Sequence, residues 1–165
     1  MKNKFYIFLL LILIIFKNSF ANELKFETTE IEVNNNGNLI YATEGKAISA
    51  DNNLEISANN FIYTKDIGLL KAFKGEALFK SENLKIKFNE ISLDQKKQFL
   101  TAKENVEIYD LKKKLLIESE LINYDKKKNI IESPVNSIIT DKNKNVLKTK
   151  NFKYETEKNI LKIKN

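Results

Sequence analysis

Apolar residues recur along this chain with a period of about thirty positions. They form four sets, called columns below, and each column contributes one residue to every copy of the repeat, at steps of 30, 30, 31 and 30 residues. The first column is Phe26, Ile56, Ile86, Ile117 and Leu147; the second is Ile31, Phe61, Ile91, Ile122 and Phe152; the third is Val33, Tyr63, Leu93, Tyr124 and Tyr154; the fourth is Leu39, Leu69, Phe99, Ile130 and Ile160. Four columns in one register over five copies indicate an internal repeat, which is typical of stacked architectures.

Two polar tracts interrupt the apolar pattern in nearly every copy. They are rich in Asn, Asp, Gly and Lys, and the first three of these tolerate the left-handed backbone conformations of tight turns. One set of tracts occupies residues 34–38, 64–68, 94–98, 125–129 and 155–159, and the other occupies residues 50–53, 80–83, 110–114 and 141–145. The sequence therefore predicts a turn at each of these places.

The segments between the tracts alternate between apolar and polar residues. Leu54–Ala58 and Leu84–Phe88 are clear examples of this period of two, which places alternate side chains on opposite faces of a sheet. The only proline, Pro134, begins the segment Val135–Thr140, where the loss of a backbone donor costs little. No stretch after residue 22 sustains a helical apolar stripe, so we expect an all-β domain.

One repeat of short strands cannot bury its own apolar face, so the copies must stack and join their columns into a continuous interior. An elongated open β-jelly roll and a β-solenoid, each built from about five thirty-residue repeats, both satisfy this requirement. Either shape leaves unpaired strands at its two ends. Either charged side chains protect such edge strands from pairing, or a strand from another chain pairs with them and extends the sheet.

Residues 1–21 have the pattern of a secretory signal peptide. Two lysines precede an unbroken apolar run of twelve residues, Phe5–Phe16, and Ser19 and Ala21 supply the small residues of a cleavage site after Ala21. A membrane span needs about 20 apolar residues, so this run is short, although an uncleaved anchor remains the alternative. The predicted organisation is a signal peptide followed by one domain, residues 22–165.

Composition narrows the classes of function. The chain has no cysteine and no histidine, which excludes Ser-His-Asp and Cys-His hydrolases and removes the commonest metal ligand. The net charge is +6, yet every basic residue is lysine, and the absence of arginine argues against nucleic acid as a partner. We expect no enzyme activity, no cofactor and no metal. The acids that could act in catalysis, such as Asp94 and Asp125, fall in predicted turns, where carboxylates are normally solvated and have no catalytic role.

Short phrases in the repeat resemble those of the OstA-like (LptA-like) family. The closest are Asn105-Val106-Glu107-Ile108 and Ile122-Asn123-Tyr124-Asp125, and the resemblance covers essentially the whole chain after the signal peptide. The fourth copy departs from the pattern, because Ser133-Pro134-Val135 stands where glycine or asparagine would precede the valine.

The resemblance implies a periplasmic β-jelly roll that carries lipopolysaccharide from the inner to the outer membrane, with the acyl chains of lipid A inside the roll. Exposing an acyl chain to water costs about 0.8 kcal/mol per methylene, so such a lipid needs a shielded path. The resemblance also implies strand addition end to end, between copies of the chain and with an inner-membrane anchored member and an outer-membrane barrel member. Two alternatives are the anchored docking member itself and a structural β-solenoid that binds no lipid.

The candidate residues follow from the columns and the ends. For lipid contact we select column residues of the middle copies, although plain core packing is the alternative for each and a one-residue slip would invert the face. These residues are Ile56, Phe61, Ile86, Ile91, Ile117 and Ile122. For contact with partners we select the terminal segments, with Phe26, Ile31, Val33, Phe152, Tyr154 and Ile160.

Overall fold

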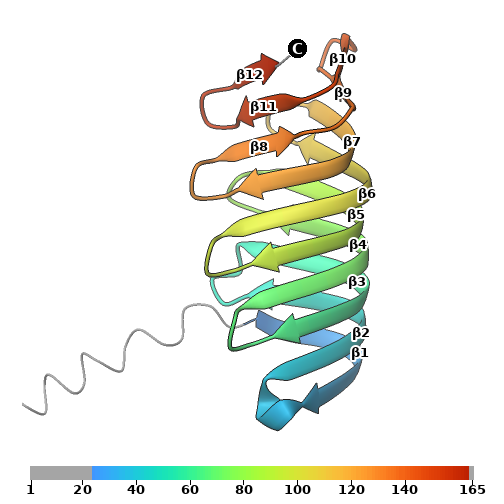
Figure 1. Ribbon diagram of the computed structural model, residues 1–165, viewed down its shortest axis with the longest axis vertical. Coiled ribbons are helices and arrows are strands. Elements are labelled where there is room, and N and C mark those ends of the chain that lie inside the picture. Colours follow the sequence, from blue (N-terminus) through green and yellow to red (C-terminus); the bar gives the residue numbers. More distant parts are fainter. Residues whose placement is uncertain (1–23, 164–165) are drawn as a thin grey trace, which may run out of the picture.

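The computed structural model describes residues 24–163, so the expected signal peptide lies outside the described residues. Residues 24–163 form a single antiparallel sheet of twelve strands without an α-helix (Figure 1). The long strands are β1 (Leu24–Asn34), β2 (Leu39–Ser49), β3 (Leu54–Thr64), β4 (Leu69–Phe79), β5 (Leu84–Asp94), β6 (Phe99–Asp110) and β7 (Leu115–Asp125). The short strands are β8 (Ile130–Ser133), β9 (Ser137–Thr140), β10 (Val146–Thr149), β11 (Phe152–Glu155) and β12 (Ile160–Ile163), and a 3-10 turn, η2 (Asn35–Gly37), joins β1 to β2. None of the helical structure in this range could cross a lipid bilayer.

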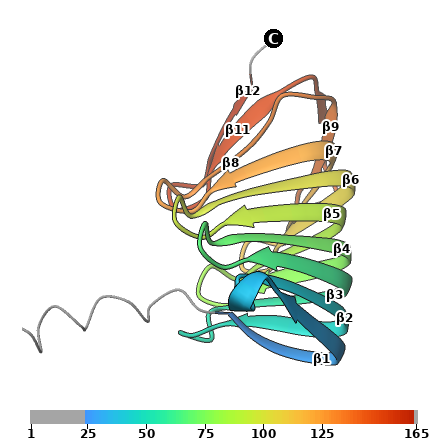
Figure 2. The ribbon, with the colours of Figure 1, turned by 60° about the horizontal axis from the view of Figure 1, so that its bottom comes forward.

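The sheet is folded over into two layers, as Figures 1 and 2 show. Consecutive strands from β1 to β7 pair antiparallel, and each long strand bends near its middle. In β3, for example, Ala58 and Phe61 are both buried although they are three residues apart, because the strand changes layer between them. The all-β prediction is confirmed, and the antiparallel order identifies an elongated open jelly roll rather than a parallel solenoid.

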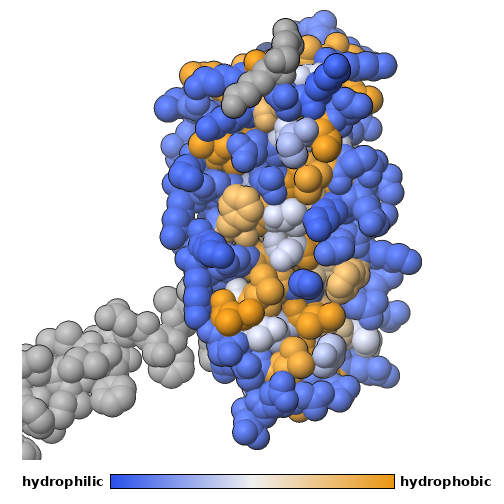
Figure 3. All heavy atoms as spheres, viewed as in Figure 1, coloured by the Kyte–Doolittle hydropathy of each residue, from blue (hydrophilic) through white to orange (hydrophobic). Residues whose placement is uncertain are grey.

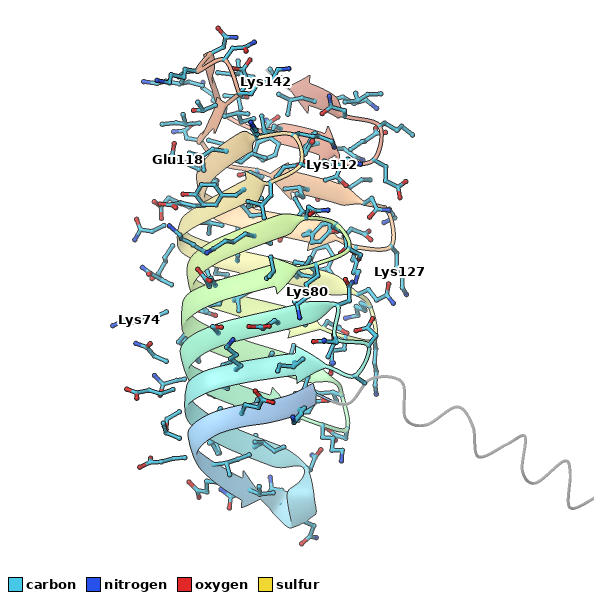
Figure 4. The ribbon with its side chains drawn as sticks, turned by 180° about the vertical axis from the view of Figure 1, so that it is seen from behind. Lys74, Lys80, Lys112, Glu118, Lys127 and Lys142 are labelled. Carbon is cyan, nitrogen blue, oxygen red and sulfur yellow. The ribbon has the colours of Figure 1, made fainter. Side chains whose placement is uncertain are left out.

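We call the two layers front and back after their positions in Figure 1. The front layer contains the turns at residues 35–38, 65–68, 95–98, 126–129 and 156–159. The back layer contains the turns at residues 50–53, 80–83, 111–114 and 141–145. The two rows of turns face each other along one side of the roll, called the mouth below, and the bend closes the opposite side. In Figure 4, seen from behind, Lys80 and Lys112 lie in the back row, whereas Lys74 lies at the bend.

Glycine makes the bend possible in the first half of the roll. A Cβ on Gly75 would lie 2.1 Å from the carbonyl oxygen of Ser57, and a Cβ on Gly45 would lie equally close to the carbonyl oxygen of Glu27. Neighbouring strands therefore approach too closely at this point for any other residue.

The next bend has Asn105 in place of glycine, and the backbone differs accordingly. Glu104 and Asn105 both adopt positive φ, and the pairing of β6 with β7 skips from Lys103 to Val106. This bulge gives β6 twelve residues where the preceding strands have eleven. The extra residue explains the single step of 31 in the repeat.

The turns form where the polar tracts predicted them, and they stack on one another. The first N–H of one turn donates to the last carbonyl of the turn before it in the same row, as from Lys65 to Asn38 at 2.8 Å and from Gln95 to Gly68 at 3.0 Å. Most turns contain one residue with φ between 54° and 66°, among them Gly68, Asn83 and Asn129. Asn and Gly adopt this conformation most readily, which is why the tracts are rich in them.

Three of the four columns point into the interior, and the fourth does not. The middle members of the first three columns are buried, whereas Leu69 and Phe99 of the fourth are only partly buried. Their successors Leu70 and Leu100 fill the core instead, opposite Tyr63 and Leu93. The expectation that the fourth column points inward was therefore one residue too early. A shift of one residue along a strand places a side chain on the opposite face of the sheet. Figure 3 shows apolar residues along the middle of the outer surface of the front layer, between polar margins.

The bend is interrupted near the C-terminal end of the roll. Pro134-Val135-Asn136 separates β8 in the front layer from β9 in the back layer, and residues 150–151 separate β10 from β11 in the same way. Proline cannot donate to the ladder, so the continuous strand of earlier copies breaks here. The two layers consequently end separately, at β12 in front and at β10 behind.

Candidate functional site

All six residues selected for lipid contact point into the interior between the layers. Their exposed fractions are 0 to 1%. Aromatic contacts across the interior accompany them: the rings of Phe26 and Phe61 meet edge to face at 5.8 Å between centroids, and those of Phe79 and Tyr124 at 5.4 Å. These six side chains therefore lie on the inward face of the folded sheet. The side chains of the two layers fill the space around them, so a lipid chain could reach them only if the layers separated.

The two rows of turns are joined across the mouth by side chains. The backbone hydrogen bonds of the turns run within each row, not between rows, in the described part of the chain. Near the middle of the mouth, Lys126 of the front row forms an ion pair with Glu82 of the back row at 3.2 Å. The ammonium group of Lys126 also lies 5.6 Å from the centroid of the Phe79 ring. Partly exposed contacts of this kind contribute modestly to stability.

A second cross-mouth contact lies nearer the C-terminal end and is more buried. Tyr154 of the front layer donates from its hydroxyl to the Asp110 carboxylate at 3.0 Å. Lys113 of the back row donates from Nζ to the same hydroxyl at 2.9 Å and to the carbonyl oxygen of Thr156. Lys113 and Asp110 also form an ion pair at 3.4 Å. Burial of the phenol, together with the nearby Asp110 charge, raises the pKa of Tyr154 well above its ordinary value.

Within residues 24–163, β1 pairs only with β2 and forms the edge strand at the N-terminal end of the roll. Ile31 and Val33 lie on this strand with exposed fractions of 55% and 54%. Phe26 is half-buried on the same strand, against Phe61 and Tyr63. Three acids and one lysine make β1 acidic. The structure thus places three of the selected interface residues at a free edge.

The C-terminal end exposes β12 and β10. Ile160 on β12 is 41% exposed, and Val146 on β10 is more exposed still. Phe152 and Tyr154, in contrast, lie on β11, between β8 and β12, with their side chains buried. The two edge strands carry lysines and no acid. The two ends of the roll therefore have opposite charge.

An ion cluster holds β12 onto β11. Lys162 of β12 and Lys158 of the intervening turn both bond the Glu155 carboxylate, at 2.6 and 2.9 Å. Hydrogen bonds from Lys162 and Lys158 lower the pKa of Glu155 to about 2.

Charges on the outer faces pair with their neighbours on adjacent strands. Lys46 bonds Glu55 at 2.6 Å, and Lys87 bonds Glu107 at 3.1 Å. Asp94 and Asp125, the acids considered for catalysis, accept from the N–H groups of Lys97 and Lys128 within their own turns. Residues 24–163 contain no group of three or more acidic, histidine or cysteine side chains that could hold a metal ion.

Sequence reasoning missed the contacts across the mouth. Lys113 belongs to a run of three lysines in a predicted turn, which signals an exposed charge and nothing more. Its partners in the front layer are 41 and 43 residues further along the chain. Only the folding of the sheet into two layers brings these groups together.

No protein-family model matches the chain, and no curated protein matches it in sequence. Among solved structures, the chain is similar to LptH of Pseudomonas aeruginosa, described as the LptA homologous periplasmic component of the lipopolysaccharide transport device. The identity is 9%, the match covers 87% of this chain and 83% of that chain, and the TM-score is 0.34. That protein is of the kind that the sequence resemblance indicated, and the fold described above rests on the strand pairing of this chain itself.

Proposed function

We propose that this chain is a periplasmic carrier of lipopolysaccharide, which shields the acyl chains of lipid A inside the roll and joins other modules end to end. The observation that carries the proposal is the single apolar interior, which runs along the roll from β1 to β11 and, within residues 24–163, is flanked by free strand edges at both ends. Export by a signal peptide that is cleaved after Ala21 belongs to the same proposal.

The construction of the roll suits a lipid that enters from the side. The bend is held by continuous backbone ladders in β1 to β7, whereas the mouth is held by side-chain contacts such as Lys126 to Glu82. Breaking an ion pair that is partly exposed costs about 0–1 kcal/mol, which is far less than breaking a ladder. A lipid chain can therefore part the rows of turns without unfolding the sheet, and it then meets Ile86 and Ile117.

The two ends suit strand addition between modules. An exposed edge strand with apolar side chains readily pairs with another chain, and β1 offers Ile31 and Val33 while β12 offers Ile160. The acidic β1 edge and the basic β12 and β10 edges favour head-to-tail contact between copies and oppose contact between like ends. The inner-membrane anchored and outer-membrane barrel members of the transport system would occupy the two ends of such a row.

Photocrosslinking in cells tests the proposal. A light-activated residue at Ile86 or Ile117, both buried in the interior, should give an adduct that is detected with an antibody to lipopolysaccharide. The same residue at Lys127, an exposed residue of a front-row turn that Figure 4 labels, is the matched control and should give none. If the protein is exported and folded but neither interior site forms an adduct, the carrier function is wrong and a lipid-free structural module becomes the better account.

A further inference from the structure

Side-chain contacts join the two rows of turns at two levels along the mouth, which we call closed, but not at a third level, which is open. Lys126 and Glu82 join the turns at 126–129 and 80–83, and Lys113 joins the turn at 111–114 to the front layer. Within residues 24–163, no hydrogen bond or ion pair connects the turn at 50–53 with the turn at 95–98. A cavity of about 110 Å³ lies at this level, between the two rows.

The floor of the cavity is apolar and its rim is polar. Leu54 and Phe79 line it from the back layer, and Leu93 and Leu100 from the front layer. The polar residues around its rim are Ser49, Asp51, Gln95, Gln98 and Lys126. An apolar floor beneath a polar rim matches a molecule that has a hydrocarbon chain and a polar group at one end.

Tyr124 provides the one buried polar group of the cavity that lacks a partner. Its side chain lines the cavity, its exposed fraction is 1%, and its hydroxyl has no hydrogen-bond partner within the described residues. Burial, with smaller contributions from Glu82 and Glu157, raises the pKa of this phenol far above its ordinary value, so the hydroxyl keeps its proton. A buried hydroxyl without a partner costs free energy, and a ligand that accepts its hydrogen bond removes that cost.

The charges at the rim determine which kind of acceptor fits. Hydrogen bonds from Ser49 and from the Asn53 N–H lower the pKa of Asp51. Burial opposes ionisation of Glu82, but hydrogen bonding from Ser81 and the charge of Lys126 lower its pKa. The cavity lining thus contains one carboxylate, Asp51, and one ammonium group, Lys126, which is already paired with Glu82 outside the lining, so an anion would gain no unpaired cation there. A neutral carbonyl oxygen is the better acceptor for the Tyr124 hydroxyl.

We propose that this cavity is the entrance for the ligand of the roll, and that it takes an acyl chain whose ester or amide carbonyl accepts a hydrogen bond from Tyr124. This inference rests on the proposed function, because the cavity holds only the first part of a chain and the remainder must pass between the layers toward Phe61 and Ile91. The turns at 50–53 and 95–98 form the two lips of the entrance. Entry at this level leaves the two closed levels of the mouth in place.

Calorimetric titration with two single-chain lipids tests the role of Tyr124 in the full-length mature protein. The lipids are 1-decanoylglycerol, which has an ester carbonyl, and 1-O-decylglycerol, an ether that lacks it. The wild-type protein should bind the ester about threefold to tenfold more tightly than the ether, as one hydrogen bond requires. Tyr124→Phe, which preserves the ring that packs on Phe79, should bind the two lipids equally.

A second pair of variants tests the entrance without altering the core. Ala50 is exposed on the back lip, so Ala50→Trp should plug the cavity and weaken binding of the ester at least tenfold. Leu111→Trp is the matched control, because Leu111 is an exposed residue of the back-row turn at a closed level, and binding should remain unchanged.

The possible outcomes separate this inference from the proposed function. If the wild-type protein binds both lipids equally and Ala50→Trp binds like wild type, the entrance lies elsewhere while the carrier function stands. If the wild-type protein binds neither lipid and shows no crosslink to lipopolysaccharide in cells, both proposals fail. Loss of binding in Ala50→Trp with full binding in Leu111→Trp supports the entrance.

Discussion

Replacement of Gly75 by alanine tests the account of the bend. The new Cβ would lie 2.1 Å from the carbonyl oxygen of Ser57 and 2.8 Å from Cα of Ala58, and both are backbone atoms of β3 that no rotamer change can move. Relief requires β3 and β4 to separate where they pair most closely. Overpacking commonly lowers the free energy of unfolding by about 1–3 kcal/mol, and a clash with backbone atoms belongs at the upper end of this range. We therefore expect Gly75→Ala to lower the free energy of unfolding by about 3 kcal/mol.

This loss converts into a measurable change in melting temperature. Unfolding entropy is about 2.1 cal/mol/K per residue, or about 0.3 kcal/mol/K over the 140 residues from 24 to 163, so Gly75→Ala should lower the Tm by about 10 °C. Circular dichroism melts of the mature protein provide the measurement. Gly37→Ala is the control: no atom lies within 4 Å of its Cβ, and its positive φ alone should cost about 1 kcal/mol, or about 3 °C. Equal Tm values for Gly75→Ala and the wild type would refute the close approach at the bend.

Three further predictions concern a turn, a cluster and an edge. Lys114 has φ of 54° where most other turns place Asn or Gly, so Lys114→Asn should raise the free energy of unfolding by about 0.5–1 kcal/mol in urea titrations, while Lys112→Asn should leave it unchanged. The pKa of Glu155 is lowered to about 2 in the fold, so its ionised form stabilises the fold fully above the unfolded pKa of about 4.3. The difference in the free energy of unfolding between wild type and Glu155→Gln should therefore shrink as the pH falls from about 4.5 to about 2. A difference that stays constant over this range would contradict the ion cluster. Val33→Lys should weaken end-to-end association in sedimentation velocity experiments without lowering the Tm, because a lysine on an exposed edge opposes pairing; Ile67→Lys, in an exposed front-row turn, should associate like the wild type.

The elements that local chemistry determines could be predicted from the sequence. The tract Thr64–Gly68 contains a turn because Gly68 supplies the left-handed residue that ends it, and the same argument holds for Asn83 and Asn129. The alternating segment Leu84–Phe88 is a strand, and Ile86 points inward as its column indicated. These predictions needed only neighbouring residues and the length of the repeat.

Features that depend on the second layer could not be predicted in this way. Leu69 and Leu70 are both apolar, and only the pairing of Leu70 with Tyr63 decides which of them enters the core. The bond between Lys113 and Tyr154 joins residues 41 positions apart, across a mouth that exists only after the sheet has folded over. The site in particular is a property of the two layers together, so a repeat pattern, which describes one layer at a time, cannot show it.

The break at Pro134 gives the two ends of the roll different structures. At the N-terminal end, β1 runs through the bend and presents one continuous edge that spans both layers. At the C-terminal end, the edge is divided between β12 in front and β10 behind, because residues 134–136 and 150–151 interrupt the strands that would otherwise pass from one layer to the other. β10 and β12 each follow a turn of their own row, so both run from the mouth toward the bend. The β1 strand of another copy runs from the mouth to the bend in the back layer and from the bend to the mouth in the front layer, so it can pair antiparallel with β12 but not with β10. Head-to-tail association of β12 with β1 would thus continue the antiparallel ladder of the front layer alone, and this restriction is a structural consequence of the break at Pro134.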